Sequence, residues 1–270
     1  MNDAQAPSKD ILERFNIADE PILIKGGQGT TWKAGKFILK PISSEEEVDW
    51  CATTIEKLPR DSFRIPKYLK TTDGKYSIDG WCALEFIEGE HMKDCWEEKV
   101  VVCKGFNNLL VDLLKPDFIE KRTNPWAIAD KMVFEEIPLN YDPRLAEYVI
   151  EIKKYLKPID MEEQIIHGDI TGNMLFADGE LPGIIDFTPN WKSKEYALAI
   201  LVVDAITWEG ADETIFKLVS NEQDIFQLLL RAAFFRALVT SEFFRQFGND
   251  RISEIDVHTR TLEMIIKEFE

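Results

Sequence analysis

The sequence predicts an α+β fold, with a small strand-rich N-terminal part and a larger, mainly helical C-terminal part. Short runs of β-branched and aromatic residues, separated by glycine turns, occur over residues 21–40 and again at 81–87. Such runs are typical of antiparallel strands. From about Asp94 the apolar residues recur at steps of three and four, which is the period of amphipathic helices. Strand-like runs return at 165–187, and the pattern after them is helical to the end of the chain.

The length and composition fit one large globular protein. With 270 residues, of which 45% are hydrophobic and 30% charged, the chain can bury a large core, as one big domain or as a two-lobed unit. The four cysteines have no metal-ligand spacing and are expected to be free thiols. Residues 1–20 are polar, and the longest apolar run, Ala197–Val203, is too short to cross a bilayer. We therefore expect a cytoplasmic protein without a membrane partner.

The formal net charge of −17 argues against nucleic acid as a partner, because phosphate binding needs clustered lysines and arginines. An acidic surface can steer a cationic small molecule toward the protein. It can equally do no more than keep the protein soluble, and both explanations stay open. In the helical part, Glu209, Asp212 and Glu213 are candidates for such steering. The sequence does not determine an oligomeric state.

The predicted N-terminal strands enclose a glycine-rich turn. Its residues are Gly26, Gly27, Gln28 and Gly29. Glycines let backbone N–H groups approach phosphates closely, and Lys40, at the end of the third strand, could reach the same phosphates. A glycine turn in an ordinary hairpin, followed by a solvated lysine, is the alternative explanation.

Helix starts are marked by local signals. Ser43 and Ser44 precede three glutamates, which predicts a capped helix running to about Leu58. Asn124-Pro125 and Asp142-Pro143 mark later helix starts. Further helices are expected at 142–156, 194–208, 222–247 and 252–269. The isolated histidines His91 and His258 are expected at the surface or its boundary.

The stretch Ile165–Phe187 carries polar side chains beside short apolar runs. Asp169, Asn173 and Asp186 each lie next to such a run, with Asp-Gly and Pro-Gly breaks between the runs. This pattern is typical of a hairpin that holds polar groups at fixed depth. Two carboxylates and one carboxamide suit a Mg²⁺–phosphate site, because Mg²⁺ takes few protein oxygens and completes its shell with phosphate and water. A surface hairpin with polar tips is the alternative.

The sequence His167-Gly168-Asp169, followed by Asn173 and by Ile184-Ile185-Asp186-Phe187, resembles the catalytic core of the aminoglycoside phosphotransferase and choline kinase families. These families share the protein-kinase-like fold. The run GGQGTTW also resembles a little-characterised bacterial branch of the phosphotransferases, from which no activity follows.

The resemblance implies a two-lobed kinase-like fold. Residues 1–84 would form an N-lobe with a small antiparallel sheet and one helix, residues 85–89 a hinge, and residues 90–270 a large, mainly helical C-lobe. The run WCALEFIEG resembles the hinge of the family, where backbone groups meet the adenine. By position, Glu85 and Ile87 would make these contacts.

The resemblance also implies roles in the catalytic loop. Asp169 would orient or deprotonate the acceptor hydroxyl, while Asn173 and Asp186 would hold Mg²⁺ on the nucleotide phosphates. His167 would brace the loop without taking part in the chemistry. Only three residues separate Asp169 from Asn173, whereas the usual loop has four, and we expect Gly172 to absorb the tighter turn.

In the N-lobe, the resemblance gives Lys40 the role of gripping the phosphates. A glutamate of the following helix would pair with this lysine. Glu47 is the first candidate for that pairing, with Glu46 and Glu56 as alternatives.

The implied activity is transfer of the γ-phosphoryl group of ATP or GTP, with Mg²⁺, to a hydroxyl of a small molecule. An aminoglycoside-like or choline-like acceptor, including a cationic one, fits this interpretation. Two alternatives stay open. One is a nucleotide-binding pseudoenzyme or scaffold, which the shortened catalytic loop favours, and the other is an AMP transferase on the same fold.

Overall fold

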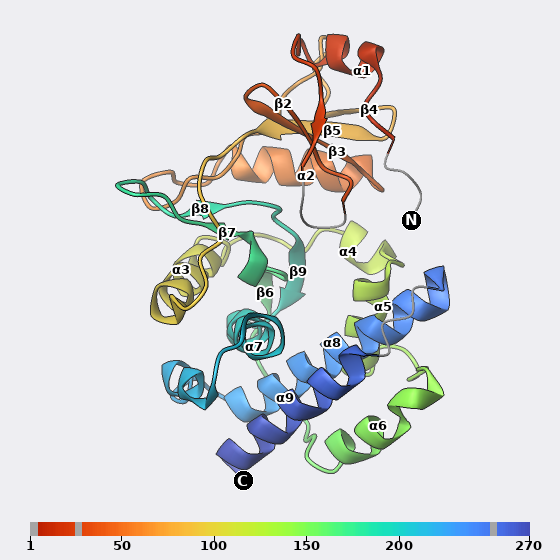
Figure 1. The fold of residues 1–270 in the computed structure, drawn as a ribbon, viewed down its shortest axis with the longest axis vertical. Coiled ribbons are helices and arrows are strands. Elements are labelled where there is room, and N and C mark those ends of the chain that lie inside the picture. The colour runs from red at the N-terminus through yellow and green to blue at the C-terminus, as the bar shows by residue number, and fades with distance from the viewer. Residues whose placement is uncertain (1–4, 25–28, 249–252) are drawn as a thin grey trace. The chain divides into compact units, whose positions relative to one another are not determined.

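The structure, a computed structural model, describes residues 5–24, 29–248 and 253–270. The chain divides into two compact units, and most of their helices and strands are labelled in Figure 1. Unit 1 comprises Met1–His91 and Asn173–Phe187, and unit 2 comprises Met92–Gly172 and Thr188–Glu270. The boundaries of these units differ from those of the predicted N-lobe (1–84), hinge (85–89) and C-lobe (90–270), and the predicted lobes and hinge stay a prediction.

Unit 1 is built on one antiparallel sheet. Its strands are β1 (Ile22–Leu23), β2 (Trp32–Ala34), β3 (Phe37–Pro41), β4 (Ser77–Ile78) and β5 (Trp81–Glu85). They follow the order β1-β2-β3-β5-β4. The unit also contains the helices α1 (Lys9–Arg14) and α2 (Glu45–Ile55), and a separate hairpin of β7 (Met174–Leu175) and β8 (Gly183–Ile184).

The sheet of unit 1 separates two apolar layers. Ala83 of β5 packs with residues of α1 and the turn after it. Its neighbours Cys82 and Leu84 pack with Val48 and Ala52 of α2, because successive side chains of a strand point to opposite faces. Figure 1 shows α1 and α2 on opposite sides of the sheet. This small, strand-rich unit agrees with the predicted N-terminal architecture.

Helix α2 begins where its sequence predicts. The Ser44 hydroxyl accepts a hydrogen bond from the Glu47 N–H at 3.2 Å, so the predicted cap is confirmed. Three acidic residues in the first turn, Glu45–Glu47, complement the positive end of the helix dipole. The helix ends at Ile55, three residues before the predicted Leu58.

Unit 2 is mainly helical. Its helices are α3 (Trp96–Asn108), α4 (Phe118–Lys121), α5 (Pro125–Val133), α6 (Ala146–Lys153), α7 (Lys194–Asp204), α8 (Ile225–Phe247) and α9 (Glu254–Phe269). Shorter helical turns are η1 (Pro143–Leu145), η2 (Thr171–Asn173, whose last residue belongs to unit 1), the π-helical η3 (Ala205–Glu209) and η4 (Glu213–Leu218). Two strands, β6 (Gln164–His167) and β9 (Pro189–Lys192), complete the unit. The predicted capping residues Asn124 and Asp142 accept N–H groups at the starts of α5 and η1.

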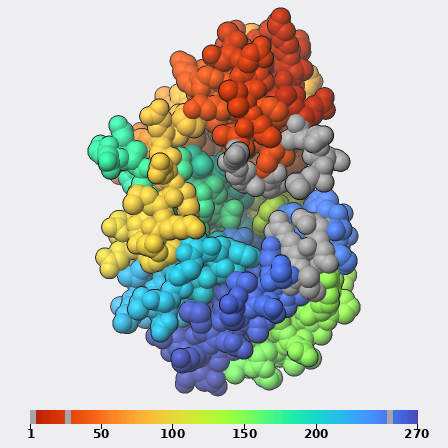
Figure 2. Space-filling view, viewed as in Figure 1, coloured from red at the N-terminus to blue at the C-terminus, as the bar shows by residue number. Residues whose placement is uncertain are grey.

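The core of unit 2 surrounds α8. This helix contacts α5, α7 and α9, and its residues from Leu228 to Glu242 are buried on every face, as expected for a central helix. Figure 1 shows α8 between these neighbours. Helix α9 is instead amphipathic, with His258, Thr261, Leu262 and Ile265 buried on one face. Its outer face lies at the surface, in dark blue in Figure 2.

The stretch at 165–187 does not form the single hairpin that its sequence predicts. Strand β6 pairs with β9, with His167 opposite Pro189, while β7 pairs with β8, with Met174 opposite Ile184. The sequence does not predict the pairing of β6 with β9, because β9 contains a proline and an asparagine, and both residue types are depleted in strands.

Three smaller expectations can be compared with the structure. All four cysteines are free, as predicted. His91 is exposed, but the prediction for His258 is wrong, because its side chain is buried and its Nε2 lies 3.0 Å from the Thr240 hydroxyl. Among the described residues, no helix is both long and apolar enough to cross a membrane.

Candidate active site

Lys40 and Asp186 meet in unit 1. Lys40 lies on β3 opposite Cys82 of β5, on the face of the sheet that α2 covers. Its ammonium group forms an ion pair with the Asp186 carboxylate. Burial lowers the pKa of Lys40 to about 8, while a carboxylate in contact favours the charged form of an amine. The ammonium group is therefore held within unit 1 by its pairing with Asp186.

Asn173 and Asp186 lie at the same end of the β7–β8 hairpin. Asn173 directly precedes β7, and Asp186 follows β8 by two residues. Because Met174 is opposite Ile184, the pairing continues outward to Ile185, whose N–H donates to the Asn173 carbonyl at 3.0 Å. The amide and carboxylate side chains thus start from adjacent points of paired backbone.

The backbone at Asp186 is turned sharply. Asp186 has a φ of 50°, in the left-handed region that is uncommon for residues other than glycine, although aspartate tolerates it better than most. The next residue, Phe187, is 8% exposed, and its ring centroid lies 6.3 Å from that of Trp50 on α2. Packing of this ring against α2 therefore fixes the turn that carries the Asp186 carboxylate.

The residues at this hairpin end suit Mg²⁺. An amide oxygen and a carboxylate are hard oxygen donors, and Mg²⁺ commonly uses one or two carboxylates, with phosphate and water filling its other positions. Among the described residues, no group of three or more His, Cys, Asp or Glu side chains could hold a metal. Asn173 and Asp186 alone would leave most positions around such a metal to phosphate and water, as Mg²⁺ prefers.

The predicted hinge residues lie along the same unit. The Glu85 N–H donates to the Lys67 carbonyl at 2.9 Å, and the Glu85 carboxylate accepts from the Lys67 N–H at 3.2 Å. A Cβ added to Gly183 of β8 would lie 3.1 Å from a methyl carbon of Ile87, so this glycine permits close packing. Since the Glu85 N–H already has an acceptor, an adenine contact at this residue would use its carbonyl.

The remaining nucleotide-binding predictions are only partly described. Gly26, Gly27 and Gln28 lie outside the described residues. Gly29 has a φ of 70°, in the region that favours glycine. Of the glutamates proposed to pair with Lys40, Glu56 accepts a hydrogen bond from the Tyr76 hydroxyl at 2.7 Å. Burial of Tyr68 raises the pKa of its hydroxyl, and the half-buried Glu47 makes a smaller contribution to this rise. The pairing of Glu47 with Lys40 stays a prediction.

His167 is buried within unit 2 and supports the loop that follows it. Its side chain is fully buried, its N–H donates to the Asn107 side-chain oxygen at 2.9 Å, and its ring lies edge-on to Phe106 at 6.0 Å. The Asp169 N–H donates to His167 Nδ1 at 3.2 Å. A neutral imidazole that accepts at Nδ1 carries its proton on Nε2. The bracing role of His167 in the catalytic loop stays a prediction.

Gly172 does not absorb the shortened loop in the expected way. It lies in the 3₁₀ turn η2 and is absent from the described glycines with positive φ. A Cβ added there would meet no atom within 4 Å. At Gly172 the turn has a backbone conformation that any residue can adopt. The tighter 3₁₀ geometry therefore accommodates a loop that is one residue shorter than usual.

Asp169 is joined to two buried side chains that the sequence did not predict. Its Oδ1 accepts a hydrogen bond from Arg236 of α8 at 2.8 Å. Arg236 also donates to both carboxylate oxygens of Asp204, at 2.6 and 2.5 Å. The side chains are 48% exposed at Asp169, 9% at Arg236 and 6% at Asp204. The cluster thus leads from a half-exposed carboxylate into the core of unit 2.

The electrostatics of this cluster follow from burial and pairing. Burial alone would lower the pKa of Arg236, but the Asp204 and Asp169 carboxylates outweigh it and raise this pKa above its ordinary value. Burial raises the pKa of Asp204, and the guanidinium of Arg236 opposes this rise. The sequence held one signal for the cluster, because Arg236 interrupts an apolar run of α8.

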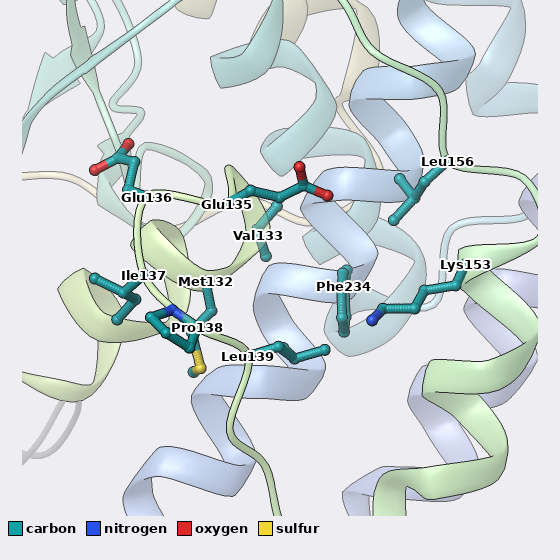
Figure 3. A pocket seen from close by; sticks show the side chains of 10 residues that line it. All are labelled: Met132, Val133, Glu135, Glu136, Ile137, Pro138, Leu139, Lys153, Leu156 and Phe234. Atoms are coloured by element: carbon teal, nitrogen blue, oxygen red, sulfur yellow. The ribbon is translucent and has the colours of Figure 1, made fainter.

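Unit 2 also contains a cavity apart from the predicted site residues. It has a volume of about 610 Å³ and is lined by residues of α5, α6, α8 and the segments that follow α5 and α6. Figure 3 shows its apolar wall, with Phe234, Leu156 and Leu139, and the charged side chains of Glu135, Glu136 and Lys153. None of the residues predicted to act on nucleotide, metal or acceptor lines it.

Comparison with known proteins identifies the family. The model of the phosphotransferase enzyme family matches residues 29–189, which is more than half of the chain. The chain belongs to this family. The predicted membership of the phosphotransferase family is thereby confirmed, and so is the prediction of an enzyme that phosphorylates small molecules, while the resemblance of GGQGTTW to one branch stays a prediction. None of the curated proteins matches the sequence of this phosphotransferase.

Solved structures with the same fold support the predicted fold class. The AMP-bound complex of a spectinomycin phosphotransferase is 13% identical with a TM-score of 0.62, covering 97% of this chain and 98% of the other. The choline kinase of Streptococcus pneumoniae is 14% identical with a TM-score of 0.63, covering 96% and 98%. An amicoumacin kinase in complex with AMP-PNP and Ca²⁺ is 13% identical with a TM-score of 0.61, covering 92% and 88%. The kinase-like α+β fold of this phosphotransferase is confirmed.

Proposed function

We propose that this phosphotransferase moves the γ-phosphoryl group of ATP, or of GTP, to a hydroxyl of a small molecule, with Mg²⁺ as cofactor. The observation that carries the proposal is the end of the β7–β8 hairpin. There Asn173 and Asp186 start from adjacent backbone, and Lys40 pairs with Asp186. Two hard oxygen donors beside a half-buried cation are what a metal–phosphate group requires.

The binding roles divide between the side chains. Lys40 would exchange its Asp186 partner for nucleotide phosphate, and the released carboxylate would hold Mg²⁺ together with Asn173. The chemistry that the metal would supply there is neutralisation of charge on the phosphates. Residues 85–89 join the two proposed lobes, and the carbonyl of Glu85 and backbone groups of Ile87 meet the adenine.

The chemistry on the acceptor belongs to Asp169. Its carboxylate orients the acceptor hydroxyl and takes up its proton, while the hydroxyl oxygen forms a bond to the γ-phosphorus. The bond from that phosphorus to the bridging oxygen breaks, and the nucleoside diphosphate leaves with the electron pair. Little else is required of the protein, because catalysis of this kind is mostly positioning and charge neutralisation.

The proposal specifies the acceptor only as a small molecule that carries a hydroxyl group. Structures with this fold include kinases of spectinomycin, choline and amicoumacin, which differ in size and charge. The net charge of −17 favours a cationic acceptor through long-range steering. Of the acids proposed for such steering, Glu209 is paired with buried Lys99 at 2.7 Å, and Asp212 caps Thr214. Glu213 is exposed, and the charge of the whole surface would add to its effect.

A screen of acceptors tests the proposed function. The protein is incubated with ATP and Mg²⁺ and, in turn, with choline, spectinomycin, kanamycin, glucose and homoserine, while ATP consumption is followed by a coupled assay. A product heavier by about 80 Da contains a phosphoryl group, as kinase chemistry requires, whereas a gain of about 329 Da identifies an AMP transferase. Binding of MgATP without any product would favour the pseudoenzyme.

Nucleotide binding can be tested without any acceptor. A ligand that binds only the folded state raises the melting temperature, so millimolar MgATP should raise that of this protein. Lys40→Met should weaken the shift, and Lys36→Met, at an exposed lysine just before the same strand, should leave it unchanged. If millimolar MgATP leaves the melting temperature of the wild-type protein unchanged, the proposed function is wrong.

A further inference from the structure

We propose that Arg236 is a positioning residue for Asp169, whose carboxylate it holds, with Asp204 as its anchor, in the orientation that receives the acceptor hydroxyl. The inference rests on the proposed function, because it assumes that Asp169 meets the acceptor. It concerns a part of the chain, helix α8, that lies beyond the matched family segment at residues 29–189.

The geometry makes Arg236 the fixed partner and Asp169 the guided one. Arg236 makes two hydrogen bonds to Asp204, at 2.6 and 2.5 Å, and the Asp204 side chain is 6% exposed. The planar guanidinium presents its donors in a rigid fork. Once two donors are set by Asp204, the direction of the bond to Asp169 Oδ1, at 2.8 Å, is set as well.

Asp169 needs such guidance, because its side chain is 48% exposed. A half-exposed aspartate can occupy several rotamers, and each unproductive rotamer lowers the population ready to react. Its backbone is already held through the bond from its N–H to His167. Arg236 supplies the second restraint, on the carboxylate itself, so that both ends of the side chain are fixed.

The restraint comes from a rigid element. Arg236 lies near the middle of α8, is 9% exposed, and stacks 5.1 Å from the ring of Phe235. Asp204 is the last residue of α7, which packs against α8. Groups held by packed helices are placed more accurately than groups on loops.

A purely structural role would not call for this arrangement. Buried ion pairs add little net stability compared with apolar side chains of similar volume. A structural arginine would also be satisfied by Asp204 inside the core, without a third bond to a half-exposed carboxylate. The third bond makes sense when the exposed carboxylate must keep one orientation.

The test must remove the guanidinium without leaving a buried charge behind. Arg236→Gln alone would strand Asp204, so the main variant combines Arg236→Gln with Asp204→Asn and replaces the ion pair by two neutral amides. The assay uses MgATP and the acceptor with the fastest turnover in the screen above. We expect kcat to fall by about 10- to 100-fold, as for misplacement of a catalytic group. The KM for MgATP and the MgATP-induced rise in melting temperature should not change.

Two further variants separate positioning from folding. Arg236→Lys keeps the positive charge but loses the fork, so it should give an intermediate kcat with wild-type KM for MgATP. Arg231→Gln is the matched control, because Arg231 is a buried arginine of the same helix that binds Gln227 and the Lys157 carbonyl. It should lower the melting temperature and keep kcat.

The outcomes distinguish this inference from the proposed function. Wild-type protein that neither binds MgATP nor phosphorylates any acceptor overturns both. Active wild-type protein together with a folded double variant that keeps more than half of kcat overturns the role of Arg236 alone. Parallel losses of kcat and MgATP binding would show a structural role and overturn it too. If the double variant does not fold, Arg236→Lys decides, and a wild-type kcat in that variant contradicts the inference.

Discussion

Binding of MgATP should draw a proton onto Lys40 in mildly alkaline solution. Burial lowers the pKa of this lysine to about 8, so the free protein loses the charge at a pH where an ordinary lysine keeps it. The nucleotide phosphates carry more negative charge than the single Asp186 carboxylate that they would replace beside the amine, so they favour its charged form more strongly and raise its pKa. The bound protein therefore holds a proton that the free protein has released.

The size of the effect follows from the pKa. With a pKa of about 8, roughly one tenth of Lys40 is neutral at pH 7 and about nine tenths at pH 9. Binding at pH 9 should thus take up most of one proton, and binding at pH 7 only a small fraction of one. If only the charged lysine binds well, the affinity for MgATP should fall about tenfold between pH 7 and pH 9.

Calorimetry measures this uptake directly. MgATP is titrated into the protein at pH 7 and pH 9, in buffers with different ionisation enthalpies, and the dependence of the observed enthalpy on the buffer gives the number of protons bound. Lys40→Met should abolish the difference between the two pH values, whereas Lys36→Met should retain it. Equal uptake at both pH values in wild-type protein, or the same alkaline uptake in Lys40→Met, would refute the reasoning.

Other substitutions probe features of unit 2. Gly172→Ala should be neutral or stabilising by up to about 1 kcal/mol, because the turn is free of positive φ at this residue and open around it; a clear drop in melting temperature would contradict this. Burial, with a smaller effect of the nearby Arg236, lowers the pKa of His258 to about 4. Below about pH 6.5 the unfolded chain therefore binds a proton that the folded chain does not. The free energy of unfolding from urea titrations should fall from pH 6.5 toward pH 4, and His258→Gln should flatten this dependence. Lys99→Met should lower the free energy of unfolding by about 3–5 kcal/mol, because it removes the fully buried ammonium group that pairs with the Glu209 carboxylate. Restored stability when Glu209 is neutralised as well would confirm the cause.

Local signals in the sequence predicted the local structure well. Ser44, Asn124 and Asp142 each cap a helical segment as expected, because a cap needs only a short polar side chain next to a helical pattern. The α+β class followed from the change of apolar period near Asp94. Such features depend on neighbours within a few residues along the chain.

Contacts between distant residues were beyond the sequence. Glu209 was a candidate for steering a cation, yet it pairs with Lys99 from another helix. Arg236 interrupts an apolar run, but nothing in that run indicates that its partners are Asp204 and Asp169. Partners of this kind are set by how helices pack, and no local period encodes them. The resemblance supplied Asp169 and Asp186, since it draws on whole motifs.

The central claim is that two aspartates have separate tasks, Asp186 with the metal nucleotide and Asp169 with the acceptor. The most direct measurement titrates MgATP into Asp186→Asn and Asp169→Asn by calorimetry and follows turnover of both variants on the acceptor found in the screen. We predict that Asp186→Asn loses MgATP binding and turnover together. Asp169→Asn should keep MgATP binding but lose turnover by roughly 10²-fold or more. Near wild-type turnover in Asp169→Asn, or loss of its MgATP binding, would contradict the account.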